Sequence, residues 1–280
     1  LFIQKGPLVQ LKDRNSPPQV HEDRDAGISY QGPLVILVNA ISASSSEILA
    51  AAMQDYRRAI IIGGEHTFGK GTVQVMLDLD RYLPAEMVRY RPLGAITLTV
   101  QKYYRITGES TQYKGVVPDI ILPDLYSYLD IGEISQPYSL PWDTIPALAF
   151  IPWKNSYTDL TEIKARSQQR LNASVRFLQL AANISRLKKQ REKTEVTLNL
   201  KKFQIEQDLL FQEAEKFNCE QVEFPYIQAR LLETAADGST AAKATLEVKR
   251  KEWISDLRQD LIIDEAIQVL NDWITPTRDR

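Results

Sequence analysis

The chain has 280 residues, which is more than one typical domain of about 100–200 residues, so two domains are expected. Hydrophobic residues make up 44% and charged residues 25%, a balance that excludes a wholly disordered or collagen-like chain. The formal net charge of −2 at pH 7 argues against a nucleic-acid-binding protein, because such proteins carry strongly basic surfaces.

Residues 1–145 are expected to form a mixed α/β domain. Residues 33–38 are an apolar run with β-branched side chains, typical of a buried strand, and residues 59–64 are a second such run. Residues 47–56 between them predict a short helix, so the three segments make a βαβ unit. Later strands are expected at 71–79, 95–106 and 116–121.

Residues 146–280 are expected to form a second, mainly α-helical domain. Charged side chains are denser there than in the first part, and prolines cluster near the change. Apolar side chains recur at helical spacing, whereas the alternating residues 195–200 predict one strand. The expected helices are 156–171, 175–191, 203–215, 241–257 and 262–274.

The chain offers few ligands for a metal ion. Cys219 is its one cysteine, so no disulfide can form within the chain, and the histidines are His21 and His66. We therefore expect neither a metal ion nor a cofactor. No apolar run approaches the roughly 20 residues that a membrane span needs, so any membrane contact is expected to be peripheral.

Serine is concentrated in residues 41–48, which follow the first strand and open the first helix. Ser44 and Glu47 have the spacing of a capping box, in which the serine caps the helix and the glutamate caps back. The alternative is a nucleophile, because a serine at a strand-to-helix turn is exposed at the sheet edge and the next backbone N–H faces an incoming carbonyl. Both interpretations stay open at this point.

A nucleophilic serine needs a base, and the histidines are poor candidates. His21 lies in a charged segment and His66 in a turn, so both are expected to be loop residues. Lys70 is the alternative, because flanking glycines let other backbone approach closely and apolar neighbours favour the neutral amine. Gln74 follows on the same side of a strand, where its amide could orient the amine. The competing interpretation is a solvent-facing lysine in a glycine turn.

Asp55 is a third candidate. It lies about three helical turns after Ser44, so both are expected on one side of the helix. At about 1.5 Å per residue, Asp55 is too far along the axis to touch the serine. The competing interpretation is a charge near the helix end, or a partner for Arg57 or Arg58.

Three segments together resemble the carboxyl-terminal processing peptidases, most closely the bacterial periplasmic tail-specific branch. They are Ser42-Ala43-Ser44-Ser45-Ser46-Glu47-Ile48, Ala50-Ala51-Ala52-Met53-Gln54-Asp55-Tyr56 and Thr67-Phe68-Gly69-Lys70-Gly71-Thr72-Val73-Gln74. Residues 32–35, 112–120 and 140–143 agree with the same family, and the helical second part matches the C-terminal extension of that branch more loosely.

The resemblance implies a serine endopeptidase that uses a Ser-Lys dyad. Ser44 falls on the family nucleophile, Lys70 on the base and Gln74 on the residue that assists the lysine. Asp55 falls on a functional aspartate of the tail-specific branch and is given a supporting role, and the N–H of Ser45 would be one oxyanion donor. Two departures are a spacing between serine and lysine that is one residue longer than usual, and Ser45 where alanine is common.

The resemblance also bears on the extent of the chain. It begins at Leu1 without an initiator methionine or a signal-peptide pattern. In the family, the second oxyanion donor and a PDZ domain precede this segment. The resemblance therefore implies a C-terminal fragment of a protease, which is expected to be inactive when isolated.

The implied partners are protein substrates with apolar C-terminal tails and a lipoprotein adaptor, and the implied location is the bacterial periplasm or cell envelope. No nucleic-acid partner is expected. Two other functions stay open. One is an interaction module that docks a partner through the C-terminal helices. The other is an acyl-CoA-handling enzyme, for which the sequence offers no phosphate-cradling glycine loop before a helix.

Overall fold

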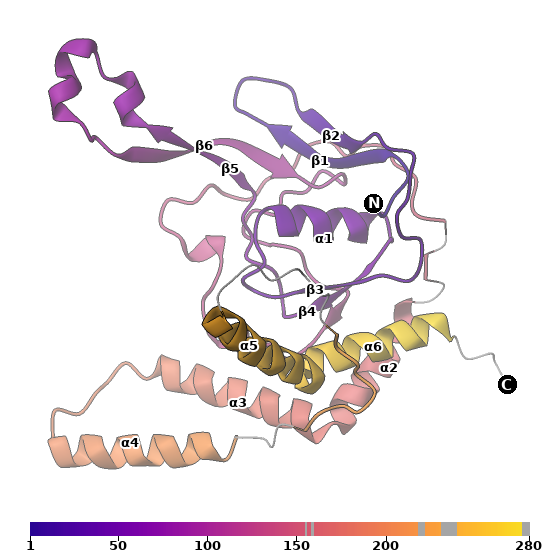
Figure 1. The fold of residues 1–280 in the computed structure, drawn as a ribbon, viewed down its shortest axis with the longest axis vertical. Coiled ribbons are helices and arrows are strands. Elements are labelled where there is room, and N and C mark those ends of the chain that lie inside the picture. The colour runs from indigo at the N-terminus through magenta and orange to yellow at the C-terminus, as the bar shows by residue number, and fades with distance from the viewer. Residues whose placement is uncertain (155, 158–159, 218–221, 231–239, 276–280) are drawn as a thin grey trace. The chain divides into compact units, whose positions relative to one another are not determined.

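The computed structural model describes residues 1–154, 156–157, 160–217, 222–230 and 240–275 (Figure 1). They fall into two compact units. The first unit comprises Leu1–Ile121 and Leu129–Thr158, and the second comprises Leu122–Tyr128 and Asp159–Arg280. Cys219 lies outside the described residues.

The first unit holds two β-sheets. One is an antiparallel sheet in the order β2-β1-β6-β5, and the other is a parallel sheet in the order β3-β4-β7. The antiparallel strands are β1 (Gly6–Lys12), β2 (Gln19–Asp23), β5 (Thr72–Asp78) and β6 (Ala95–Tyr104). The parallel strands are β3 (Val35–Val38), β4 (Ile60–Gly63) and β7 (Ile120–Ile121). The mixed α/β class predicted for this part is therefore confirmed.

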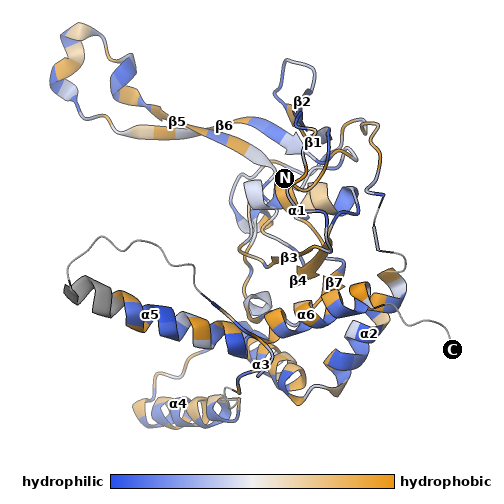
Figure 2. Cartoon of the chain, turned by 45° about the vertical axis from the view of Figure 1, so that its right-hand side comes forward, coloured by the Kyte–Doolittle hydropathy of each residue, from blue (hydrophilic) through white to orange (hydrophobic). Residues whose placement is uncertain are grey.

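The predicted βαβ unit is formed by β3, helix α1 (Ser45–Asp55) and β4. The two strands pair in parallel, and every residue of β4 is buried, as its apolar composition requires (Figure 2). The alanine-rich face of α1 packs on this layer, with Ala50 fully buried and Met53 nearly so. Burial of that face fixes the start of α1 against the carboxyl end of β3.

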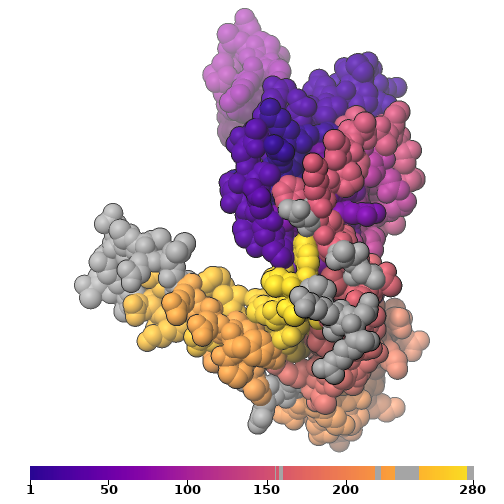
Figure 3. All heavy atoms as spheres, turned by 90° about the vertical axis from the view of Figure 1, so that its right-hand side faces the viewer, coloured from indigo at the N-terminus to yellow at the C-terminus, as the bar shows by residue number. Residues whose placement is uncertain are grey.

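Strands β5 and β6 form a long hairpin, which projects beyond the rest of the first unit (Figures 1 and 3). Two short 3-10 turns, Leu79–Tyr82 and Ala85–Tyr90, lie at its far end. A register shift between Val73 and Gln74 interrupts the pairing near its base. The base of the hairpin is buried, whereas its outer part is exposed on both faces.

The second unit is helical, as the sequence predicts. Its helices are α2 (Leu160–Ala173), α3 (Val175–Glu192), α4 (Leu200–Glu215), α5 (Thr240–Gln259) and α6 (Leu261–Ile274). Three of them begin at a side-chain cap, supplied by Ser174, Asn199 and Asp260. Within the described ranges, every helix is too short or too polar to span a bilayer.

The strand predicted at residues 195–200 is wrong. These residues have no regular structure up to Leu200, where α4 begins. The side chain of Asn199 accepts a hydrogen bond from the N–H of Lys202 at 3.2 Å and so starts the helix. Alternation alone is a weak signal, because a strand also needs a partner strand for its backbone groups.

Candidate active site

Ser44 lies at the turn between β3 and α1, and its backbone is strained. Its φ of 58° and ψ of −116° fall outside the extended region that a capping residue normally adopts. The capping box is nevertheless formed, because the N–H of Ser44 donates to the Glu47 carboxylate at 2.8 Å. A cap does not need this strain, whereas strained residues that the surroundings hold in place cluster at functional sites. The conformation of Ser44 therefore favours the nucleophile over a helix cap alone.

Glu47 ties the serine turn to the lysine segment. Its side chain is fully buried, and beyond Ser44 it accepts hydrogen bonds from the Thr67 hydroxyl at 2.5 Å and the Gly69 N–H at 2.7 Å. A fourth bond comes from the N–H of Lys70 at 3.0 Å. Burial raises the pKa of Glu47, and the hydrogen bonds oppose that rise. One carboxylate thus positions both candidate catalytic segments.

The Lys70 side chain donates to the Gln74 side-chain oxygen at 3.0 Å, so the predicted pair is brought together. A cavity of about 540 Å³ opens beside both residues, with Phe68 and Ala43 also in its wall. Both Ser44 and Lys70 are described, and no hydrogen bond joins the serine hydroxyl to the amine. Hydrogen bonds between catalytic groups are often long in a protein without substrate and shorten when substrate binds.

The two glycines beside Lys70 allow another segment to pack against it. Gly69 has a φ of +84°, and a Cβ on it would lie 2.7 Å from the backbone oxygen of Tyr113. A Cβ on Gly71 would lie 2.6 Å from the N–H nitrogen of Gln112. The N–H of Gly71 is bound by the Gln112 side chain at 2.7 Å. A larger residue at either position would therefore clash with the backbone of residues 112–113, and one of the two segments would have to shift.

Tyr103, near the end of β6, contacts both the serine turn and the lysine segment. Its buried hydroxyl donates to the backbone oxygen of Lys70 and lies 3.3 Å from that of Ser44. Burial strongly raises the pKa of Tyr103, so it stays a neutral donor. The sequence analysis missed Tyr103 and gave Glu47 only a capping role. Both residues contact Lys70 across more than 20 positions of sequence, and local patterns do not show contacts at that range.

Ser45 is the first residue of α1 and is exposed. Among the described residues no acceptor is recorded for its N–H, as expected for the first donors of a helix. That N–H is available to an oxyanion, and the helix dipole adds to its attraction. The histidines lie elsewhere: His21 is in strand β2 rather than in a loop, and His66 contacts the neighbouring Thr67 oxygen.

Asp55 is buried near the far end of α1 and pairs with Arg105, through two contacts that include Nε to Oδ2 at 3.2 Å. The competing interpretation is met in its first form, because Asp55 is the last residue of α1, but its ion-pair partner is neither Arg57 nor Arg58. Arg58 donates to three backbone oxygens. Burial raises the pKa of Asp55, and Arg105 opposes that rise. Arg105 directly follows β6, the strand that carries Tyr103. Asp55 is therefore linked to Ser44 and Lys70 through Arg105 and this strand.

The Asp55–Arg105 pair gives a stability prediction. Asp55→Asn is expected to lower the free energy of unfolding by about 3 kcal/mol, because it leaves Arg105 half-compensated in a buried place. Denaturant unfolding of the 280-residue chain measures this. Asp78→Asn is the matched control, since its pair with Arg81 is exposed and is expected to contribute less than about 1 kcal/mol. Equal unfolding midpoints for the two variants would contradict the prediction.

Comparison with known proteins shows which family the chain belongs to. Residues 1–122 match the family described as Peptidase family S41, and residues 126–275 match the C-terminal domain of tail specific protease. The chain is 39% identical over 211 residues to the Tail-specific protease of Haemophilus influenzae, covering 74% of this chain and 30% of that protein. It is 37% identical to the Carboxy-terminal-processing protease of Bartonella bacilliformis, covering 46% and 28%.

A solved structure, the photosystem II D1 C-terminal processing protease, is 33% identical with a TM-score of 0.36, covering 43% of this chain and 28% of that one. The chain spans less than a third of the length of the two curated relatives. The two family matches together cover most of its residues. The chain therefore belongs to the carboxyl-terminal processing proteases of peptidase family S41, and it carries the C-terminal domain of the tail-specific proteases.

Proposed function

We propose that the chain carries the nucleophile and base of a serine endopeptidase that uses Ser44 and Lys70. The strained backbone of Ser44 is the observation that carries this proposal. The buried Glu47 carboxylate supports it, because it holds the serine turn and the lysine segment together. The Lys70–Gln74 hydrogen bond supports the role of Lys70, and the relatives are named as proteases.

In this mechanism the Ser44 hydroxyl attacks the scissile carbonyl, while Lys70 in its amine form takes the hydroxyl proton. The N–H of Ser45 donates to the oxyanion that forms. Lys70 then gives its proton to the leaving amine, and an acyl-enzyme remains on Ser44. Lys70 next takes a proton from water, which attacks the acyl carbonyl, and transfer of that proton to Ser44 releases the new carboxylate. Gln74 accepts one N–H of the amine and so orients its lone pair.

The proposed substrates are proteins with apolar C-terminal tails. The proposed location of the protease is the bacterial periplasm or cell envelope, and a lipoprotein adaptor is proposed as a further partner. Strand β5 lies at the edge of its sheet and carries Gln74. An extended peptide could pair with that edge and pass Lys70, which directly precedes the strand. Asp55 is proposed as a positioning residue that acts through Arg105 and β6.

The test compares two neighbouring serines. Ser44→Ala is expected to abolish degradation of an unfolded protein with an apolar C-terminal tail, whereas Ser45→Ala is expected to retain it, because only the Ser45 N–H is used. Degradation is followed on gels in the longest polypeptide that its gene encodes, and the 280-residue chain, which is expected to be inactive when isolated, is measured beside it. Degradation that survives Ser44→Ala would leave the serine as a helix cap and bring the interaction-module function forward.

A further inference from the structure

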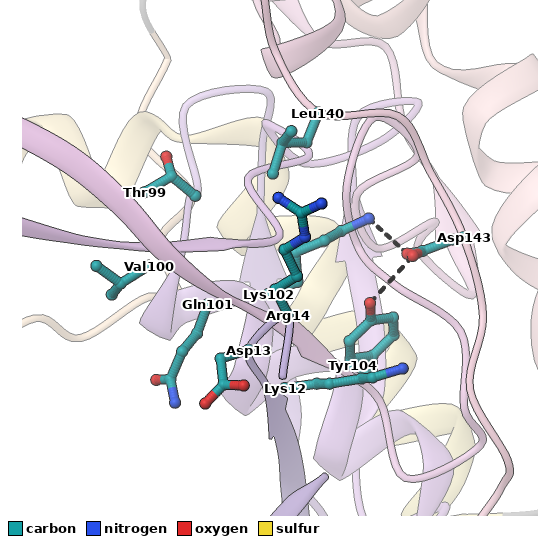
Figure 4. Close-up of a pocket in the computed structure, with 10 residues that line it drawn as sticks. All are labelled: Lys12, Asp13, Arg14, Thr99, Val100, Gln101, Lys102, Tyr104, Leu140 and Asp143. Atoms are coloured by element: carbon teal, nitrogen blue, oxygen red, sulfur yellow. Dashed lines mark hydrogen bonds and ion pairs between the residues drawn. The ribbon is translucent and has the colours of Figure 1, made fainter. Parts of the chain in front are cut away.

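A second cavity lies in the first unit and is lined by basic side chains (Figure 4). Its volume is about 330 Å³, enough for an acidic side chain or the last residue of a peptide. Lys12 ends strand β1, Arg14 follows it, and Lys102 comes from β6. In Figure 4 the Arg14 guanidinium points toward Leu140, and Lys102 extends beside it toward Asp143.

The acidic side chains around this cavity already have other partners. Asp143 accepts from Lys102 at 2.5 Å and from the Tyr104 hydroxyl at 3.2 Å. Asp13 accepts from the backbone N–H groups of two following residues at 2.8 and 2.6 Å, which lowers its pKa. No ion pair is recorded for Lys12 or Arg14 with any acidic side chain in the described part of the chain.

The register of the sheet makes this arrangement costly. Lys12 and Lys102 are directly opposite each other in the antiparallel pairing of β1 with β6. Like charges at such positions destabilise a sheet, and Arg14 adds a third positive charge to the same cavity. Asp143 compensates Lys102, so Lys12 and Arg14 are the two charges for which the described residues show no ion pair. A bound anion would relieve that repulsion. The guanidinium of Arg14 offers the forked donors that suit a carboxylate.

The basic cavity adjoins the cavity beside Lys70. Thr99 and Leu140 line both of them, so they form a shared wall. A peptide held beside Lys70 and Gln74 would therefore place a neighbouring part of its chain near Lys12 and Arg14. This inference rests on the proposed peptidase function, since it takes the occupant of the first cavity to be a polypeptide.

We propose that Lys12 and Arg14, which line this cavity, bind a carboxylate of the polypeptide substrate, a few residues from the scissile bond. The carboxylate is either the terminal one or that of an acidic side chain. Both present the same planar anion to the cavity. The site thus selects substrates by charge, next to the cavity that Lys70 lines.

The experiment measures peptide binding without cleavage, in the 280-residue chain carrying Ser44→Ala. A short apolar peptide with a fluorescent amino terminus is prepared with a free C-terminal carboxylate, with a C-terminal amide, and with the amide plus an internal glutamate. Fluorescence anisotropy gives the Kd of each. We expect at least one carboxylate peptide to bind about 10-fold more tightly than the plain amide, and this preference to shrink at high salt. The peptide that shows it identifies the source of the carboxylate.

Variants then place the effect in the cavity. The double variant Lys12→Gln/Arg14→Gln is expected to remove the preference, and Lys5→Gln, an exposed lysine of the same unit outside the cavity, is expected to keep it. Equal binding of all three peptides to the Ser44→Ala chain would overturn the proposal, as would a preference that survives the double variant. Cleavage that depends on Ser44 without any carboxylate preference would refute this inference alone. A carboxylate preference that the double variant removes, together with cleavage that does not depend on Ser44, would refute the proposed mechanism alone.

Discussion

Lys70→Ala is expected to lower the rate of proteolysis by about 10³-fold or more while the protein stays folded. The rate falls because Lys70 is the group proposed to take the proton of Ser44, and alanine has no proton acceptor to replace its amine. The fold survives because the backbone of Lys70, not its side chain, anchors the segment. Its N–H binds Glu47, and its carbonyl oxygen accepts from Tyr103.

Lys70→Arg makes this prediction sharper. Arginine keeps the positive charge and much of the length of the side chain, but it cannot be deprotonated in a protein. Lys70→Arg is therefore expected to be as inactive as Lys70→Ala, although it still binds substrate. Proteolysis rates and denaturant unfolding of both variants are measured beside Gln74→Ala, which is expected to slow the reaction less. Cleavage by Lys70→Arg near the wild-type rate would show that a positive charge, not a base, is what the site needs.

Glu47→Ala is expected to abolish proteolysis and also to lower the free energy of unfolding by about 3–5 kcal/mol. The substitution leaves several buried donors without an acceptor, each worth about 1–3 kcal/mol. They are the N–H groups of Ser44, Gly69 and Lys70 and the hydroxyl of Thr67. Denaturant unfolding and a proteolysis assay measure the two effects.

Glu47→Gln distinguishes the loss of side-chain volume from the loss of hydrogen-bond acceptors. It fills the same space, but its NH₂ group would face donors on one side, because the N–H groups of Ser44, Gly69 and Lys70 and the hydroxyls of Thr67 and Tyr103 all donate to the carboxylate. We expect it to lose both stability and activity, although less than alanine. Glu133→Gln is a control at a partly buried glutamate in the wall of the cavity beside Lys70. A fully active and stable Glu47→Gln variant would rule out the proposed positioning role.

The parts of the site that local sequence predicts are those with short spacing. The capping box of Ser44 and Glu47 and the Lys70–Gln74 pair each lie within five residues, where backbone geometry alone limits what can touch. The helices of the second part were predictable for the same reason, because their apolar spacing repeats. The strand expected at 195–200 failed because alternation says nothing about a partner strand.

Long-range contacts were beyond this reasoning. Asp55 has arginines close by in sequence, yet it pairs with Arg105, which the antiparallel sheet brings to the end of α1. Tyr103 reaches the lysine segment only because β6 pairs with β5 across the hairpin. Such contacts depend on strand register and on the turn lengths between strands, and neither follows from composition or periodicity.

The shared use of one carboxylate also governs how the site comes apart. The backbone N–H groups of Ser44, Gly69 and Lys70 all donate to the single side chain of Glu47. In sequence, Ser44 precedes β4 and the two other residues follow it. The helix start cannot fray without releasing the lysine segment, and the lysine segment cannot open without loosening the helix start. Nucleophile and base therefore belong to one cooperative unit of local unfolding. The site is either assembled as a whole or lost as a whole.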